Sequence, residues 1–309
     1  MTDHTRAHDG PAHHSHHHHG EASGHGPLFD SEAMAARLEL EGEVLGGIVT
    51  DAVARLYELC ERRGLQVRRV LDIGSGPGVA TCALAERFGD ARVVAADGSA
   101  TMLEHVSSRA ERLGLASRVE TRLVDLPEGV GSLGRADVVW ASLVIHHVGD
   151  EVDVLRRLRE RLERHGLLAV VEFADPMRVV PEDVDLGRPP GLWARIDAAW
   201  QAWFEDMRAE LPGSTPSADY SAMLAEAGFE VLVDEVLSTV VDPPLDDRAR
   251  RFARQQLEGA QTRLVSHADP ADLAALDALL DESDPEVLDR AGARLSASRR
   301  LYVSAVTTG

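Results

Sequence analysis

Short runs of β-branched and small apolar residues alternate with helical stretches between residues 67 and 173, and this alternation constrains the fold most strongly. The predicted strands are 67–73, 91–97, 118–125, 136–142 and 166–173. Helical periodicity lies between them, near 79–88, 100–114 and 151–164. Continuously apolar strands that alternate with helices form parallel sheets covered on both faces. Since crossovers are right-handed, we expect a doubly wound α/β domain that binds ligands at the carboxyl ends of its strands.

The segments on either side of this region are predicted to be helical or disordered. Residues 1–27 hold nine of the fourteen histidines and almost no apolar residues, so we expect a disordered tail. Periodic apolar residues in 28–66 predict a helical cap, which Gly46 and Gly47 divide in two. Residues 67–309 form the main predicted domain, with helical insertions at 176–216 and 243–297 and further strands at 229–241 and 299–306.

The composition excludes several classes of function. A formal net charge of −20 disfavours binding to nucleic acid, which is itself a polyanion. All 32 basic residues are arginine, and the absence of lysine excludes a Schiff-base lysine and a P-loop lysine. No apolar run approaches the length of a membrane span, and two cysteines in predicted helices form neither a disulfide framework nor a zinc site. We therefore expect a cytoplasmic protein that binds neither membranes nor nucleic acid.

A glycine-rich loop joins the first predicted strand to the helix that follows, in the segment VLDIGSGPGVAT at 70–81. Its glycines let the backbone bend sharply and approach a ligand, while the helix N-terminus presents free N–H groups. A dinucleotide-binding loop needs a glycine where Val79 stands, and Asp72 would oppose a pyrophosphate. The loop therefore suits a cationic amino-acid ligand better than a nicotinamide dinucleotide.

The pattern Asp72-x-Gly74-x-Gly76-x-Gly78 resembles the first motif of class I S-adenosylmethionine-dependent methyltransferases, and the resemblance covers roughly 67–175. It implies a Rossmann-like methyltransferase fold with a mostly parallel seven-stranded sheet, and S-adenosylmethionine as the cofactor. It also implies which residues contact each part of that cofactor. These are Asp72, Gly74, Ser75, Gly76 and Gly78 at the methionine end, Asp97 at the ribose hydroxyls, Gly98, Met102, Asp125 and Leu126 at the adenine, and Ser142 beside the sulfonium.

Candidate catalytic residues follow the fourth and fifth predicted strands, in LVIHHVGD and at the end of GLLAVVEF. Imidazole titrates near neutral pH and can remove a proton from a hydroxyl or amine during methyl transfer. The VIH segment and the strand-five glutamate are similar to those of small-molecule O-methyltransferases that use a histidine base. That resemblance implies His146 as the base and Glu172 as the group that orients it. A structural or cofactor-contacting role for His146 is the alternative.

An aromatic helix from Leu192 to about Leu211 is the predicted source of acceptor contacts. Trp193, Trp200 and Phe204 recur at spacings of seven and four, which places them on one helix face. Such an insertion after the fifth strand is predicted to form an apolar lid over the acceptor, with packing onto the core as the alternative. Trp193 and Trp200 are therefore predicted acceptor contacts, together with His147. The N-terminal helices are expected to close the other side, with Glu41 or Glu43 facing the cleft.

These features predict methyl transfer to a small-molecule acceptor, with O- or N-methylation favoured. A quinone-type C-methyltransferase is a related alternative, while a nicotinamide oxidoreductase and a non-catalytic cofactor-binding or metal-binding protein represent other classes. The histidine run HHSHHHH at 13–19 could hold a divalent metal loosely, and no metal is predicted at the active site. The sequence leaves open whether the protein is a monomer or a homodimer.

Overall fold

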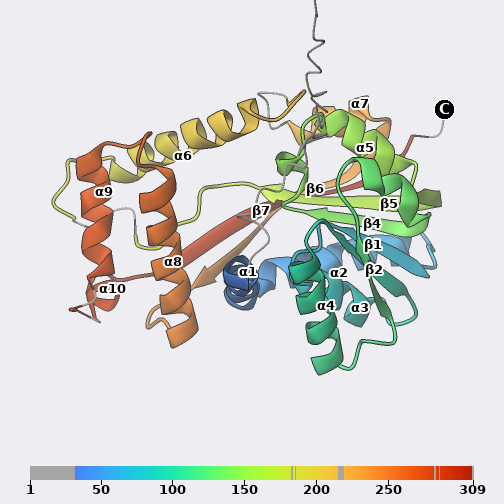
Figure 1. The fold of residues 1–309 in the computed structure, drawn as a ribbon, viewed down its shortest axis with the longest axis horizontal. Helices are drawn as coiled ribbons and strands as arrows, with labels where there is room; N and C mark the ends of the chain where they lie inside the picture. Colours follow the sequence, from blue (N-terminus) through green and yellow to red (C-terminus); the bar gives the residue numbers. More distant parts are fainter. Residues whose placement is uncertain are drawn as a thin grey trace, which may run out of the picture.

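The chain folds around one seven-stranded sheet (Figure 1). The computed structural model describes residues 32–181, 184, 186–214, 219–281, 283–284 and 286–307. The strands are β1 (Arg69–Ile73), β2 (Arg92–Asp97), β3 (Val119–Leu123), β4 (Ala136–Ser142), β5 (Leu162–Phe173), β6 (Phe229–Val241) and β7 (Leu295–Val306). Their order is β3-β2-β1-β4-β5-β7-β6, and β7 alone runs antiparallel to its neighbours. The predicted doubly wound, mostly parallel fold is confirmed.

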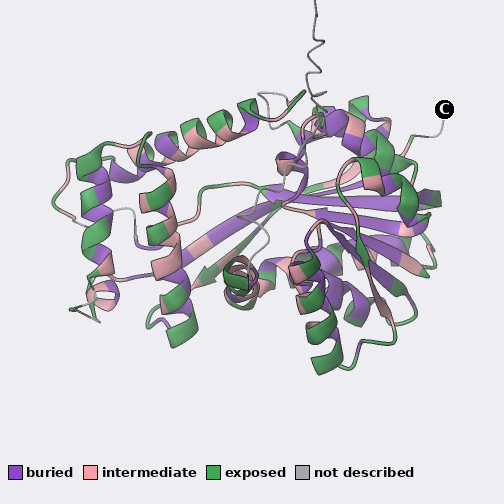
Figure 2. Cartoon of the chain, viewed as in Figure 1, coloured by how far each residue is buried: buried purple, intermediate pink, exposed green. Residues whose placement is uncertain are grey.

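Helices cover both faces of the sheet, as the continuously apolar strands require. One face carries α2 (Gly46–Arg62), α3 (Val79–Arg87) and α4 (Ala100–Arg112). The other carries η1 (Glu128–Leu133), α5 (Glu151–Arg159) and α7 (Tyr220–Glu226). Buried residues line the strands and the sheet-facing sides of the helices, whereas the outer sides are exposed (Figure 2).

The first helix, α1 (Glu32–Val44), lies beside the start of α3. It packs against α4 and against α8 (Asp247–Arg263), which is far from it in the sequence. A side chain at Gly42 would collide with the Val79 side chain, so glycine permits this close approach. The break between α1 and α2 falls at Leu45, next to the glycine pair that predicted it. Residues 1–31, including the histidine-rich tail, lie outside the described residues.

A group of helices lies beside the projecting ends of β6 and β7 (Figure 1). It comprises α6 (Leu192–Ala209), α8 (Asp247–Arg263), α9 (Pro270–Asp277), η3 (Ala278–Leu280) and α10 (Val287–Arg290). Apolar residues of α6, α8 and α9 join the same core as α2 and α3. None of the helices in the described part of the chain is long and apolar enough to cross a membrane.

Two strands begin earlier than the sequence pattern indicates. The helix expected to reach 164 ends at Arg159, and β5 starts at Leu162, which pairs with Ala136 ahead of a bulge. Exposed polar residues from Glu163 to His165 hide this strand start, since they interrupt the apolar run. Similarly, β7 begins at Leu295 because Leu295–Ser298 continue the pairing with β6, and Leu295 and Ala297 are buried in the core while serines alternate with them.

A buried carboxylate connects the start of α6 to α9. Asp272 accepts hydrogen bonds from Arg195 Nε and Arg188 Nε, both at 2.7 Å. The hydrogen bonds from Arg195 and then Arg188 lower the pKa of Asp272 to about 2. Because the folded-state pKa lies below the ordinary value of 3.8, this contribution to stability is present above that value and is lost as pH falls through about 2.

We expect Asp272→Asn to reduce the free energy of unfolding by about 2 kcal/mol near neutral pH, since two arginines lose their charged partner. Urea denaturation of the two proteins measures the difference, which should shrink at about pH 3. Asp277→Asn, on the exposed side of the same helix, is the matched control. An equal loss in both variants would contradict the assignment.

Candidate active site

The loop between β1 and α3 depends on glycine at its turning points. Gly74 and Gly78 have φ angles of 66° and 83°, in the left-handed region that favours glycine. A Cβ atom at residue 78 would lie 3.0 Å from the Val106 Cα atom, and one at residue 74 would collide with Val144. A Cβ atom at residue 76 would lie 3.8 Å from Leu38 Cδ1, which is an ordinary van der Waals contact. The glycines therefore let this loop pack closely against Val106 and Val144 at the carboxyl ends of the strands.

Asp97, at the end of β2, faces this loop. Its carboxylate accepts hydrogen bonds from the backbone N–H groups of Gly76 and Ser99, each at 2.9 Å. Ser99 caps α4 by accepting a hydrogen bond from the Met102 N–H. A Cβ atom at Gly98 would lie 3.4 Å from Asp125 Oδ1, so the third acid stands at the same edge. The structure thus brings together predicted residues near the ends of three strands: Gly76 after β1, Asp97 in β2 and Asp125 after β3.

Asp72, at the end of β1, is buried and accepts a hydrogen bond from Thr81 Oγ1 at 2.6 Å. Burial raises the pKa of Asp72 to about 7, although the Thr81 hydroxyl opposes that rise and Asp97 adds to it. A cation placed at this edge would favour the ionised carboxylate, because opposite charges lower the pKa of an acid.

His146 and Glu172 form a buried pair across the ends of β4 and β5. Their exposed fractions are 3% and 2%, and His146 Nδ1 lies 2.7 Å from Glu172 Oε2. The second oxygen, Oε1, accepts the Ile145 N–H at 3.2 Å, which fixes the carboxylate. An ionised carboxylate can only accept hydrogen bonds, so we assign the imidazole proton to Nδ1. Nε2 then carries the lone pair that a base requires.

Aromatic rings surround this histidine. The ring of His146 lies 4.1 Å from that of His147, 5.0 Å from that of Phe173 and 5.6 Å from that of Phe204. Phe173 is 51% exposed, which is unusual for a large apolar side chain and typical of a binding surface. Phe173 is not among the residues predicted from the sequence, and its position directly after Glu172 is the signal that points to it.

The end of α6 reaches the site through Phe204. Arg208, one turn further on, is buried in an ion pair with Glu151 at the start of α5. Its guanidinium also lies 5.8 Å from the centre of the Phe204 ring. The ion pair therefore anchors the last turn of α6, and with it Phe204, beside His146.

Comparison with known proteins identifies the family. Residues 70–166 match a methyltransferase domain family. The chain is 30% identical to the trans-aconitate 2-methyltransferase of Azoarcus sp. over 243 residues, which cover 77% of this chain and 86% of that protein. The chain belongs to the class I S-adenosylmethionine-dependent methyltransferases.

Two further proteins are similar to this chain. The trans-aconitate 2-methyltransferase of Rhizobium etli is 30% identical over 187 residues, or 59% of this chain and 65% of that protein. A methyltransferase from Thiobacillus denitrificans, in complex with S-adenosyl-L-homocysteine, aligns with 83% of this chain and 91% of that chain. Its TM-score is 0.44 at 17% sequence identity.

The residues at the carboxyl edge fit S-adenosylmethionine, the cofactor of this methyltransferase. A glycine-rich loop that a ligand can approach closely and two acids with acceptor oxygens suit a ligand that carries an ammonium, a sulfonium and a vicinal diol. Among the predicted contacts, Met102 is buried in the first turn of α4, and Leu126 packs near η1. Ser142 ends β4, and the next residue, Leu143, has a φ of 53°, so the chain turns sharply there.

The two predicted tryptophans lie away from the His146–Glu172 pair. Trp193 is buried in the core, and its Nε1 donates a hydrogen bond to the Pro181 carbonyl at 3.3 Å. Trp200 packs edge-on against Trp203, with ring centres 5.4 Å apart. Of the aromatic residues on α6, Phe204 is the one whose ring contact with His146 the structure shows.

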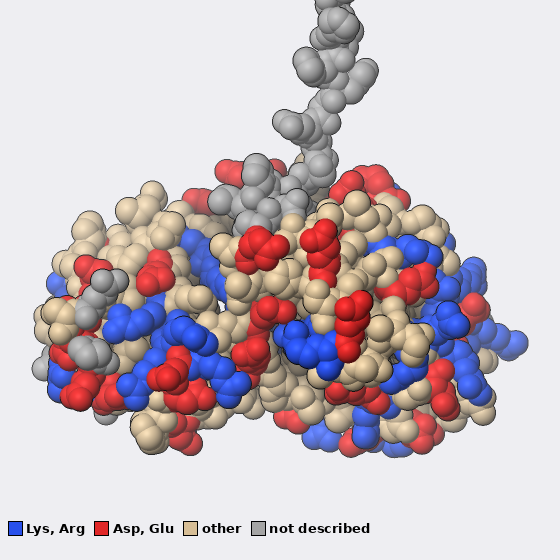
Figure 3. All heavy atoms as spheres, turned by 60° about the horizontal axis from the view of Figure 1, so that its bottom comes forward, with Lys and Arg blue, Asp and Glu red and all other residues tan. Residues whose placement is uncertain are grey.

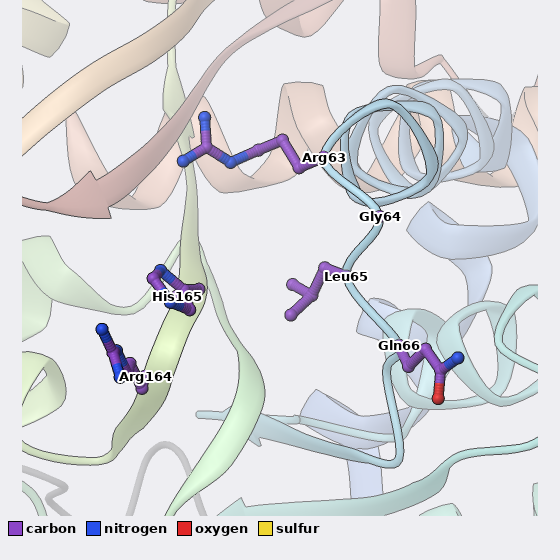
Figure 4. A pocket seen from close by; sticks show the side chains of 6 residues that line it. All are labelled: Arg63, Gly64, Leu65, Gln66, Arg164 and His165. Carbon is purple, nitrogen blue, oxygen red and sulfur yellow. The ribbon is translucent and has the colours of Figure 1, made fainter.

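A pocket at the amino ends of the strands does not overlap this site (Figure 4). Its lining residues are Arg63, Gly64, Leu65, Gln66, Arg164 and His165. These residues precede β1 or lie in the first part of β5, so the pocket adjoins the amino ends of the strands. Within the residues that the structure describes, no group of His, Cys, Asp and Glu could hold a metal ion. The histidine run at 13–19 falls outside that range.

Proposed function

We propose that this methyltransferase methylates a hydroxyl oxygen or an amine nitrogen of a small molecule, with His146 as the general base. The observation that carries the proposal is the buried 2.7 Å contact between His146 Nδ1 and Glu172 Oε2, next to the exposed Phe173 ring. When bound, S-adenosylmethionine supplies an electrophilic methyl carbon on a sulfonium. The chain must align the acceptor and remove its proton.

Glu172 prepares His146 for that proton transfer in two ways. It holds the imidazole in the tautomer whose Nε2 is unprotonated, and it stabilises the imidazolium that forms when Nε2 takes the proton. The backbone N–H of Ile145 keeps the carboxylate in place whether the imidazole of His146 is neutral or protonated. Phe173 and Phe204 offer apolar surface against which an acceptor can pack.

We also propose the cofactor contacts. Asp72 would hold the ammonium of the methionine moiety, beside the backbone of Gly74, Ser75, Gly76 and Gly78. Asp97 would hold the ribose hydroxyls. Gly98, Met102, Asp125 and Leu126 would surround the adenine, while Ser142 lies nearest the sulfonium. The convergence of the acids at one sheet edge supports this assignment.

Asp72→Asn is expected to change stability and cofactor affinity in opposite directions. The folded-state pKa of Asp72, about 7, is above the ordinary 3.8, so stability is lost as pH rises between these values. Without cofactor at about pH 8, the free energy of unfolding of the variant should therefore be about 2 kcal/mol higher than that of the wild type, because the variant buries no ionised carboxylate.

The affinity of the same variant for S-adenosylmethionine should fall about tenfold at that pH, because a charge-assisted contact to the ammonium is lost. Thermal unfolding and calorimetric titration measure the two effects. Asp90→Asn, at an exposed position after α3, should change neither. Lower stability together with unchanged affinity would count against the role of Asp72.

A second candidate function is esterification of a carboxylate. The names of the two relatives above favour it, since trans-aconitate is a polycarboxylate. A carboxylate is already ionised near neutral pH, so this reaction needs no general base. His146 would then position the acceptor rather than deprotonate it.

Identification of the methylated atom separates the two candidates. The full chain is incubated with labelled S-adenosylmethionine and a panel of phenols, hydroxy acids, amines and polycarboxylates, and the products are identified by mass spectrometry and NMR. A methyl ether or N-methyl product supports the first proposal. A product methylated only on carboxylate or carbon would overturn it.

A further inference from the structure

Three arginines from distant parts of the chain converge around one acid. Arg37 lies on α1, Arg263 ends α8 and Arg299 lies on β7. Glu41, also on α1, accepts a hydrogen bond from Arg299 Nη2 at 3.1 Å. The cluster of Arg37, Glu41, Arg263 and Arg299 is called the arginine cluster below. Its net charge is positive, in a chain whose net charge is −20.

The guanidinium groups of Arg37 and Arg263 lie close together beside Gly259. A Cβ atom at Gly259 would lie 2.6 Å from Arg263 Nη1 and 3.6 Å from Arg37 Nη2, so both guanidinium groups stand over this glycine. Within the described ranges, neither Arg37 nor Arg263 forms a hydrogen bond or an ion pair, whereas Arg299 uses Glu41. Burial and then the charge of Arg37 lower the pKa of Arg263, and Glu41 opposes them. Glu41 is already hydrogen-bonded to Arg299, so an anionic ligand would further relieve the repulsion between the guanidinium groups of Arg37 and Arg263.

The arginine cluster connects to the candidate active site through aromatic side chains. The Arg299 guanidinium lies 4.9 Å from the centre of the Phe173 ring, which contacts His146. Arg263 lies 5.8 Å and 5.7 Å from the ring centres of Trp200 and Trp203 on α6. Figure 3 shows one face of the molecule, on which the surface is indented between its left and right parts. An acceptor lying over Phe173 would therefore have cations at one end and the imidazole near the other.

We propose that Arg37 and Arg263 bind a carboxylate of the acceptor, so that the acceptor is a small acid whose methylated hydroxyl or amine lies at His146. Guanidinium groups match carboxylates geometrically and remain charged at any working pH. Arg299 is held by Glu41 and orders the Phe173 side of the site. The orientation of the acceptor rests on the proposed function, whereas carboxylate binding by the two arginines does not.

Binding without turnover tests the arginines. The full chain is saturated with S-adenosylhomocysteine and titrated calorimetrically with 4-hydroxycinnamate, malate and trans-aconitate, and with the methyl ester of each acid. We expect at least one acid to bind about tenfold or more tightly than its ester. Arg263→Gln and Arg37→Gln should each reduce the affinity for that acid to nearly that of the ester. Arg251→Gln, an exposed arginine on the same helix as Arg263, should leave it unchanged.

The remaining outcomes are equally decisive. If no acid binds at millimolar concentration, if the esters bind as tightly as the acids, or if the two variants retain wild-type affinity, the proposal is wrong. Thermal unfolding of the ligand-free proteins separates binding from folding. Arg37→Gln should not lower the stability, and any loss in Arg263→Gln, which gives up the contacts with Trp200 and Trp203, is measured independently of acid binding. His146→Ala should bind the acid with the wild-type affinity, because the carboxylate contacts Arg37 and Arg263. Binding of the acid therefore tests the two arginines whether or not His146 proves to be the general base.

Discussion

His146→Ala is expected to lower kcat by about 10²- to 10⁴-fold while the Kd for S-adenosylmethionine changes little, because a general base acts in the transition state rather than in cofactor binding. The side chain is buried and its Nδ1 contacts Glu172, so only Nε2 is available to an acceptor. Initial rates at saturating cofactor and acceptor, with separate titration of the cofactor, measure the two quantities.

Two further variants make this result specific. Glu172→Gln keeps the shape of the pair but removes the charge that stabilises the imidazolium, so it should lower kcat by a smaller factor, about tenfold or more. His165→Ala removes an exposed histidine at the opposite edge of the sheet and should change neither kcat nor Kd. If His146→Ala retains kcat within about threefold of the wild type, His146 is not the base, and esterification of a carboxylate becomes the better candidate.

Much of the fold follows from local periodicity. The runs at 136–142 and 229–241 are the strands β4 and β6 with identical bounds. The apolar run of β4 is mostly buried in the sheet, whereas β6 is an edge strand rich in β-branched residues. The cofactor edge was also predictable. In a doubly wound sheet, Asp72 and Asp97 must meet at the carboxyl ends of β1 and β2, whatever the rest of the chain does.

Other features depend on how elements dock, which periodicity does not encode. Spacing placed Trp193, Trp200 and Phe204 on one face of α6 but could not show which part of the helix reaches His146. The buried pair of Arg208 and Glu151 decides this, since it anchors the last turn beside α5. Trp193, almost three turns earlier, packs in the helical group instead.

The arginine cluster also could not be predicted from periodicity. Arg37 and Arg263 are separated by more than two hundred residues, and they lie in the separate helices α1 and α8. Their proximity arises only because α1 packs against α8 over Gly259. The expectation that Glu41 or Glu43 faces the cleft was the one signal in the sequence, and Glu41 is the member of that pair in contact with Arg299.

Asp97→Asn is expected to raise the Kd for S-adenosylmethionine by about 100-fold and to lower the free energy of unfolding by about 1 to 3 kcal/mol, because a buried backbone N–H loses its acceptor. In the described structure both carboxylate oxygens face donors, the N–H groups of Gly76 and Ser99. An asparagine has one acceptor oxygen and one NH₂ group, so one backbone N–H would face another donor. The ribose diol, if held here, also needs two acceptors and would lose one of them.

Calorimetric titration with S-adenosylhomocysteine measures the effect of Asp97→Asn without turnover, and Asp125→Asn is the matched comparison. Asp125 is exposed, so its hydrogen bonds compete with water and its loss should raise the Kd by a smaller factor, about tenfold or less. An Asp97→Asn protein that binds within about twofold of the wild type would remove Asp97 from the cofactor site. The ordering of the two variants therefore tests whether the ribose lies at the buried end of β2 or the cofactor is held chiefly from the exposed end of β3.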